Sequence, residues 1–231
     1  HELICNVKTL KNPKAGDPII YFLENREYYE QRANVYGYSD DHIRFGLLSR
    51  SVLEFLGKSD FRPNIIHIND WHTAYAANFL ETEHEGSDHL KGVGILLSVH
   101  NLYQGVFDFD HATEMDSDDG KGPLASFFSD RFYKQNALKR GIIYSDVVNT
   151  VSQTYSREIM TEQYGNRLAN LFKELRGKLY GVMNGLDYGS FNPKTDKIIK
   201  KNYSVVGLPA RVDNKIDLQK EFNLKVSAKT Q

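Results

Sequence analysis

The stretch PNIIHINDWHTA, residues 63–74, changes character halfway along its length. Its first half is an apolar, β-branched run of the kind that forms a core strand. Its second half is polar and aromatic, and it contains Asn69, Asp70, His72 and Trp71, which is the only tryptophan of the chain. The stretch therefore predicts a buried strand that ends in side chains able to do chemistry.

Short apolar runs of the same kind recur along the chain, and most of them show little polar alternation, as strands covered on both faces do. Segments with helical periodicity separate them. This alternation predicts an α/β fold, a Rossmann-like parallel sheet flanked by helices. The predicted strands are residues 19–24, 64–70, 94–101, 146–152 and 179–185, and the predicted helices are residues 39–57, a helix starting at Trp71, and residues 122–141.

Capping residues set the expected ends of these helices. In the first, Ser39 is expected as the N-cap and Gly57 as the end. In the third, Pro123 stands at an early helical position and Gly141 at the end. The final segment 220–231 resembles a helix that runs out into a polar tail.

Four of the predicted strands pass into a polar cluster where they end, with the sequences HINDWH, SVHN, NTVSQT and VMNGLD. In an open parallel sheet these carboxyl ends share one edge, and ligands bind in the crevice beyond it. Asp70 and His72 are therefore expected at the binding edge of the sheet.

Structural roles remain open for several of these side chains. His67 lies between two isoleucines, so we expect a core histidine with a hydrogen-bond partner. Asp70 equally suits the N-cap of the helix that follows. His100 and Asn101 follow a strand without a local structural need, and ligand contact is an open alternative for both. The set of His67, Asp70 and His72 does not converge on a metal ion, because odd separations in a strand place side chains on opposite faces.

Composition narrows the class of protein. The 231 residues carry 29 Lys and Arg against 30 Asp and Glu, a net charge of −1, so no overall field favours nucleic acid or a membrane. Cys5 is the only cysteine, which excludes an internal disulfide. The sequence contains no phosphate-binding loop, no dinucleotide-binding fingerprint and no nucleophile elbow. A small polar ligand is the expectation.

Two stretches, residues 81–89 and 107–122, have the composition of surface loops. The second contains Asp116, Asp118 and Asp119, a weak similarity to the sequence of a calcium-binding loop. A calcium site is not predicted, because Phe127 occupies the position at which a bidentate glutamate closes such a loop. We expect a solvated, mobile loop.

Four segments resemble motifs of one family, the bacterial glycogen synthases and plant starch synthases, in the same order and at about the same spacing. They are PNIIHINDWHTA, SVHNLYQGVF, YSDVVNTVSQTYSREI and GVMNGLDYGSFNPKTD. The stretch YFLENREYYEQRANVYGYSDDHIRFGLLSR resembles the region ahead of them, and the match runs from about residue 19 to about residue 225.

The resemblance implies the N-terminal half of a glycosyltransferase B fold, two Rossmann-like domains that face each other across a cleft. Residues 1–225 would be the acceptor-side domain, without its first strand and helix and the lysine- and glycine-rich donor loop. Residues 226–231 would begin the linker to a C-terminal nucleotide-binding domain of the same protein. The family uses no metal and no cofactor.

By the same resemblance, site residues carry over onto matching positions of this chain. Asp70 and His100 fall on the catalytic aspartate and histidine, and Asn101 on a neighbouring sugar contact. Tyr38 matches a tyrosine near the nucleotide. The other implied substrate contacts are Tyr103, Gln104, Asn184 and Asp187.

The implied activity is transfer of glucose from ADP-glucose or UDP-glucose to the non-reducing end of an α-1,4-glucan with retention. It would take place in a bacterial cytoplasm or a plastid, without nucleic acid or membrane partners and without secretion. We expect this fragment alone to be inactive. Three departures stand out: the VHNLYQG loop is one residue shorter than usual, Gln153 replaces a proline, and Phe191 replaces a tryptophan.

Two other functions stay open. One is a non-catalytic glucan-binding or regulatory module, and the other is a related retaining glycosyltransferase with a different acceptor.

Overall fold

The computed structural model describes residues 3–11, 14–105 and 115–230. The chain divides into two compact units, His1–Met183 and Asn184–Gln231. Within the described ranges, no helix has the length and apolar character needed to span a membrane.

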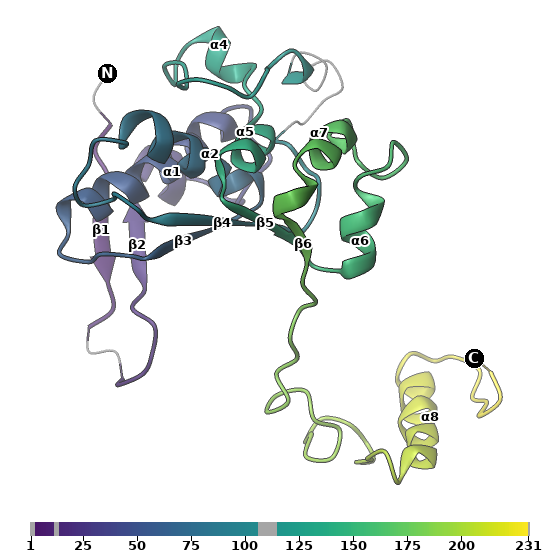
Figure 1. The fold of residues 1–231 in the computed structure, drawn as a ribbon. Helices are drawn as coiled ribbons and strands as arrows, with labels where there is room; N and C mark the ends of the chain where they lie inside the picture. Colours follow the sequence, from purple (N-terminus) through teal and green to yellow (C-terminus); the bar gives the residue numbers. More distant parts are fainter. Residues whose placement is uncertain (1–2, 12–13, 106–114, 231) are drawn as a thin grey trace. The chain divides into compact units, whose positions relative to one another are not determined.

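The first unit is built on a sheet of four parallel strands that lie side by side in chain order (Figure 1). Helices connect these strands, as crossovers between parallel strands require. The α/β fold expected from the sequence is therefore confirmed. The strands are β3 (Ile65–Asn69), β4 (Gly94–Val99), β5 (Val147–Thr150) and β6 (Leu179–Gly181), and the connecting helices include α2 (Asp70–Glu83), α5 (Ala137–Tyr144), α6 (Gln153–Glu158), α7 (Ala169–Glu174) and a 3₁₀ turn at Arg176–Lys178.

One face of this sheet carries the core. Ile66 and Ile68 of β3, Leu97 of β4 and Val148 of β5 are all buried on this face. Figure 1 shows α1 (Asp41–Lys58), α2 and α5 on the same side of the sheet. Burial of these side chains is the main stabilising term of the unit, since each fully buried aliphatic side chain contributes about 1.5–3 kcal/mol.

Within the first unit, the described residues leave much of the other face of the sheet open. Ile65 is 64% exposed, Val147 38% and Tyr180 53%. The prediction that the strands are covered on both faces is therefore wrong for the described part of this unit. His67 lies on this uncovered face and is exposed, so it is not a core histidine, although its Nε2 does have a partner, Ser98 Oγ at 2.7 Å.

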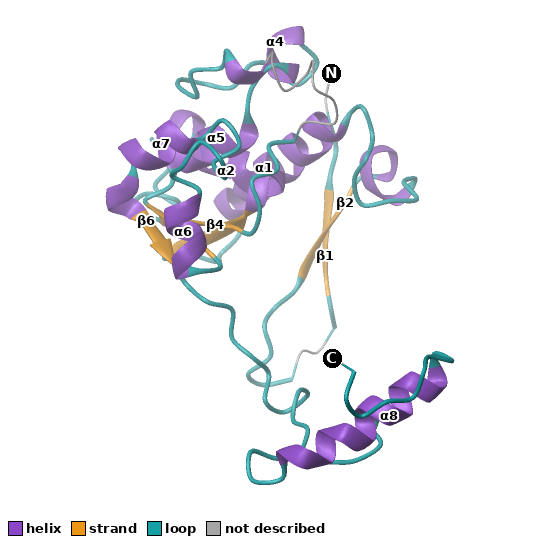
Figure 2. Ribbon diagram, turned by 90° about the vertical axis from the view of Figure 1, so that its right-hand side faces the viewer, coloured by secondary structure: helices purple, strands orange, loops and turns teal. Residues whose placement is uncertain are grey.

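The segment 19–24 forms a strand that does not join the parallel sheet. Its strand β2 (Tyr21–Glu24) pairs antiparallel with β1 (Asn6–Thr9), and Figure 2 shows the two as a separate ribbon. The Tyr21 ring packs against Phe55 of α1, with 4.8 Å between the ring centroids. The expectation of a fifth parallel strand is wrong because an apolar run does not show which partner it pairs with. A π-helical turn, Arg26–Glu30, follows the ribbon.

The first predicted helix is confirmed as α1, but both of its expected ends are wrong. Asp40, not Ser39, is the N-cap, and Ser59 is the C-cap. Gly57 lies inside the helix, because packing of the last turn on the core outweighs the cost of about 1 kcal/mol for an internal glycine.

The segment 122–141 forms two short helices instead of the single predicted one. They are α4 (Asp130–Tyr133) and α5. Ser129 Oγ accepts a hydrogen bond from the Phe132 N–H at 3.2 Å and thereby caps α4. Asn136 Oδ1 does the same for α5, accepting from the Lys139 N–H at 2.9 Å. Two caps inside one periodic segment divide it.

Gly141 serves packing, not helix termination. It lies within α5, and a Cβ at this position would come within 2.6 Å of Ala74 Cβ on α2. Pro123 precedes both short helices and lies in neither. At the other end of α2, the helix continues to Glu83 and so includes part of the loop expected at 81–89.

The acidic segment expected as a solvated loop contains a buried ion pair. Residues 107–114 lie outside the described residues. Beyond them, Asp118 accepts from Arg140 Nε at 2.9 Å and from Nη2 at 2.8 Å, and the Arg140 side chain is only 1% exposed. Arg140 also donates to Asn78 Oδ1 at 2.8 Å and to the Gly122 carbonyl at 3.0 Å. The solvated interpretation is therefore wrong for Asp118.

The second unit has its own short elements. Its longest helix, α8 (Arg211–Glu221), ends at Glu221, and Asn223 has a left-handed backbone with φ of 54°. The expected helical start of segment 220–231 is thus limited to its first residues. The Gln219 amide bonds to Ser227, whose N–H donates to Oε1 at 2.9 Å. The described helices of this unit are a 3₁₀ turn at Leu208–Ala210 and α8 (Arg211–Glu221).

Replacing Asp118 with alanine should lower the free energy of unfolding by about 3 kcal/mol, because it leaves the Arg140 guanidinium buried without its counter-charge. Asp119→Ala is the matched control: Asp119 is exposed, so its loss should change stability by less than about 0.5 kcal/mol. Urea unfolding followed by circular dichroism measures both. Equal stability of the two variants would contradict a structural role for the pair.

Candidate functional site

The junction between β3 and α2 has a constrained backbone. Asp70, the first residue of α2, has φ of 53°, in the left-handed region that non-glycine residues seldom adopt. Thr73 Oγ1 accepts from the Asn69 N–H at 2.7 Å and donates to the Asn69 carbonyl at 2.9 Å. Such strain costs about 1–3 kcal/mol and persists where surrounding bonds fix it, typically at binding and catalytic sites.

This backbone brings the ends of β3 and β4 together through side chains. Asp70 Oδ1 accepts from the His100 N–H at 2.7 Å and lies 3.5 Å from the Asn101 nitrogen. His100 Nε2 in turn lies 3.1 Å from Asn69 Oδ1, an acceptor, so this nitrogen donates. Asp70 makes no side-chain cap on α2, whose N-cap is Asn69, so its carboxylate serves the strand junction instead.

The buried side chain of Trp71, the residue after Asp70, packs next to this junction. It is 2% exposed, and its ring meets Phe45 of α1 edge-on at a centroid distance of 4.8 Å. Gly105 also lies against the indole, where a Cβ would come within 2.7 Å of Trp71 Cε3. Its φ of 90° also favours glycine. The tryptophan therefore fixes the loop that follows His100.

The residues of the loop after His100 differ in how far they are buried and hydrogen-bonded within the protein. Asn101 Oδ1 accepts from the Tyr103 N–H at 2.9 Å, and Tyr103 is 41% exposed. Gln104 is buried, with Nε2 donating to the Asn166 carbonyl at 2.7 Å and Oε1 accepting from Asn136 Nδ2 at 2.5 Å. Both ends of the Gln104 amide thus bond within the protein, where they hold the loop in place.

Tyr38 lies at the start of α1 in a charged environment. The buried pair of Asp41 and Arg44 fixes its backbone, since Asp41 Oδ2 accepts from the Tyr38 N–H at 3.2 Å. The guanidinium carbons of Arg32 and Arg44 each lie 5.0 Å from the centroid of the Tyr38 ring. The Tyr38 hydroxyl accepts from the Asn34 N–H at 3.0 Å. The backbone, the ring and the hydroxyl of Tyr38 thus each contact neighbouring residues of the segment 32–44.

Sequence reasoning placed His72 at this edge without giving it a role. Its ring packs against Phe45 at a centroid distance of 4.7 Å and against Tyr36 at 6.0 Å. Burial lowers the pKa of His72 below its ordinary value, and the negative charges of Asp70 and Asp41 oppose this shift only in part. The imidazole is therefore neutral at pH 7.

Tyr155 was not among the site residues predicted from the sequence, although it lies in the third motif. It lies on α6, directly after β5, where Ser152 Oγ accepts from its N–H at 3.2 Å. Burial raises the pKa of the Tyr155 hydroxyl, and the negative charge of Asp70 adds to the shift. Its position in the first turn after a third strand was the available signal.

Asn184 and Asp187 belong to the second unit. Hydrogen bonds lower the pKa of Asp187, first from the Ser190 hydroxyl at 2.6 Å and then from the backbone N–H groups of Ser190 and Gly189. Asn184 is exposed. Their expected place beside the first unit's residues stays a prediction.

In the described part of the chain, no three histidine, cysteine, aspartate or glutamate side chains form a group that could hold a metal ion.

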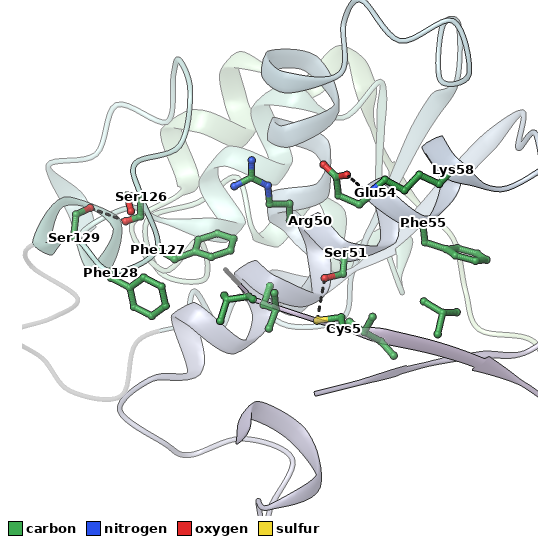
Figure 3. A pocket seen from close by; sticks show the side chains of 14 residues that line it. Cys5, Arg50, Ser51, Glu54, Phe55, Lys58, Ser126, Phe127, Phe128 and Ser129 are labelled. Atoms are coloured by element: carbon green, nitrogen blue, oxygen red, sulfur yellow. Dashed lines mark hydrogen bonds and ion pairs between the residues drawn. The ribbon is translucent and has the colours of Figure 1, made fainter. Parts of the chain in front are cut away.

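A large cavity lies elsewhere in the first unit. It has a volume of about 780 Å³ and is lined by the β1–β2 ribbon, α1 and Ser126–Ser129 (Figure 3). In it, Ser51 Oγ donates to Cys5 Sγ at 3.6 Å, and Lys58 pairs with Glu54 at 3.4 Å. Neither Asp70 nor His100 lines this cavity. The volume of a cavity alone therefore does not identify the candidate site.

Comparison with known proteins assigns the family. A family model described as the starch synthase catalytic domain matches residues 2–174. The chain belongs to this starch synthase family. It is 39% identical over 213 residues to the glycogen synthase of Clostridium beijerinckii, a match that covers 90% of the chain and 44% of that protein. It is 40% identical over 214 residues to the glycogen synthase of Thermosipho melanesiensis, covering 92% and 44%.

A solved family structure agrees with the fold. It is the catalytic domain of starch synthase IV from Arabidopsis thaliana bound to ADP and acarbose, with a TM-score of 0.71 and 26% sequence identity. The match covers 98% of this chain and 50% of that one. The chain therefore spans about half the length of the starch synthase family members it matches. The family assignment also confirms the resemblance seen in the four sequence motifs.

The stability of the chain should depend on pH through His72. Because its folded-state pKa is depressed, the unfolded chain binds this proton more readily, and stability falls as the pH drops below the ordinary value of 6.5. His72→Gln removes that titration, so its stability should fall less than that of the wild type between about pH 7.5 and pH 5.

Urea unfolding at a series of pH values measures both proteins, and the remaining histidines cancel in the comparison. An equal or steeper loss in His72→Gln would show that the packed imidazole does not carry this effect.

Proposed function

We propose that this chain is the acceptor-side part of an α-1,4-glucan synthase, which transfers glucose from ADP-glucose or UDP-glucose to the non-reducing end of the glucan with retention. The observation that carries the proposal is the hydrogen bond from the His100 N–H to Asp70 Oδ1 at the shared edge of β3 and β4. It joins the two residues for which the family motifs imply catalysis.

The chemistry of glucosyl transfer suits a fixed carboxylate. A glucosyl group that leaves a diphosphate passes through an oxocarbenium-like state, in which positive charge develops on the sugar. Asp70 is already oriented by backbone N–H groups, so its negative charge stabilises that state without reorganisation. In this mechanism it acts on the hydroxyls of the donor or the acceptor sugar.

His100 orients the sugar in the same mechanism. Its Nε2 is bonded to Asn69, which fixes the plane of the ring. The remaining ring nitrogen then meets a sugar hydroxyl in a defined position, and such positioning lowers the entropic cost of reaction. Asn101 and Tyr103 follow directly and add sugar contacts, whereas Gln104 holds the loop.

The relatives support the substrates proposed. The bacterial relatives are glycogen synthases, and the Arabidopsis starch synthase IV domain binds ADP and acarbose. We therefore propose a nucleoside diphosphate glucose and a glucan as ligands, and no metal or cofactor. The nucleotide-binding domain would come from the remainder of the full-length protein, with Asn184 and Asp187 near the crossing between the domains. A bacterial cytoplasm or a plastid fits this activity.

In the full-length gene product, Asp70→Ala and His100→Ala should each lower kcat by about 100-fold or more, the scale of losing one positioned electrostatic group. Asp60→Ala, which removes an exposed carboxylate before β3, should leave kcat within about twofold. Incorporation of radiolabelled glucose into glucan measures all three.

Near-normal kcat in both site variants would refute these roles. If the wild-type protein transfers glucose from neither nucleotide sugar, the synthase proposal itself is wrong, and retained binding of maltooligosaccharide would then favour a non-catalytic glucan-binding module.

A further inference from the structure

Three aromatic side chains gather beside the Asp70 and His100 junction. They are Tyr36, His72 and Tyr103, here named the aromatic platform. Tyr36 is 59% exposed and Tyr103 41%, so both rings present surface to solvent. The Tyr36 and His72 ring centroids are 6.0 Å apart. Contiguous exposed apolar surface of this kind often marks a binding site.

Buried Trp71 supports the platform from beneath. Its ring centroid lies 4.4 Å from that of His72 and 6.3 Å from that of Tyr103. Because Trp71 is itself fixed by Phe45 and Gly105, the rings above it rest on a rigid base. A preformed aromatic surface costs less entropy on binding than one that must be ordered.

The platform is continuous with the catalytic edge. His72 lies two residues after Asp70, whose negative charge acts on it. The Tyr103 N–H in turn donates to Oδ1 of Asn101, the neighbour of His100, at 2.9 Å. A ligand on the platform would therefore extend toward Asp70 and His100.

The charges around the platform favour a neutral ligand over a diphosphate. Arg44 is buried and paired with Asp41, and Arg32 is paired with Asp40 at 2.6 Å. These cations are engaged within the protein, whereas a diphosphate group needs cations or N–H donors directed at it. The pyranose rings of a glucan are neutral, and their apolar faces stack on aromatic rings while their hydroxyls bond to carboxylates.

Tyr36 and Tyr38 differ in what their rings can contact. Tyr38 has two guanidinium groups against its ring and its hydroxyl bonded to the Asn34 N–H. Tyr36, two residues earlier, is exposed and touches His72. The ring that is available to a substrate is therefore that of Tyr36.

We propose that Tyr36 binds the acceptor glucan by stacking under one of its glucose units, with His72 and Tyr103 completing the aromatic platform. This inference rests on the proposed function and adds to it a specificity-determining residue to which the family resemblance gave no role. It assigns the platform to the acceptor and not to the nucleoside of the donor.

The test uses the full-length gene product with maltohexaose as acceptor, varied at saturating nucleotide sugar, and then the reverse. Tyr36→Ala should raise the KM for maltohexaose about 10-fold, the loss expected for one aromatic stacking contact, and leave the KM for the nucleotide sugar within about twofold. Tyr36→Phe keeps the ring and should leave both values within about twofold. Tyr164→Ala, which removes another exposed tyrosine, 49% exposed, is the matched control and should change neither.

Two outcomes would overturn the proposal. One is an unchanged KM for maltohexaose in Tyr36→Ala, and the other is a rise in the KM for the nucleotide sugar instead, which would assign the ring to the nucleoside. If Tyr36→Ala does not fold by circular dichroism, Tyr36→Leu, which keeps an apolar side chain without an aromatic face, takes its place with the same expectations.

Failure of the proposed function is separable. If the wild-type protein shows no transfer, isothermal titration of maltohexaose into the wild type and Tyr36→Ala still tests the platform. A dissociation constant raised about 10-fold in the variant supports the stacking contact, and equal constants or no binding to either protein overturn it.

Discussion

The hydrogen bond between the Asp70 carboxylate and the His100 N–H is the constraint on which the site depends. It joins the ends of two neighbouring parallel strands, and Asp70 makes it from a left-handed backbone. The buried indole of Trp71 then fills the space beneath, and Gly105 allows the next loop to lie against it. One strained residue, one ring and one glycine thus give this edge of the sheet its geometry.

Much of the fold was predictable because the pattern of short apolar runs and amphipathic segments reports local structure. The strands β3, β4, β5 and β6 and the helices α1 and α2 all lie where the sequence places them. Partners were not predictable: the segment 19–24 pairs with a ribbon strand, and Asp118 is buried against Arg140, 22 residues away in sequence. Pairing and burial depend on tertiary contacts that no local pattern carries.

For the site, the sequence motifs named Asp70 and His100, and the structure places them in contact. Residues to which the family resemblance gave no role were not predicted as part of the site. Tyr155 follows β5 on α6, and Tyr36 packs against His72 from a segment ahead of α1, so only the folded chain relates them to Asp70 and His100. Gln104 shows the opposite case, since its motif position suggests a ligand contact while its amide bonds to Asn136 and the Asn166 carbonyl.

The bare face of the sheet has a practical consequence for work with this polypeptide. This face exposes apolar side chains to solvent, namely Ile65, Val147 and Tyr180. Exposed apolar surface of this kind tends to bind apolar surfaces of other molecules. At high protein concentration, that patch promotes self-association and adsorption to apolar surfaces. Crystallisation or spectroscopy on the isolated chain will gain from a solubilising fusion or from polar residues engineered into this surface.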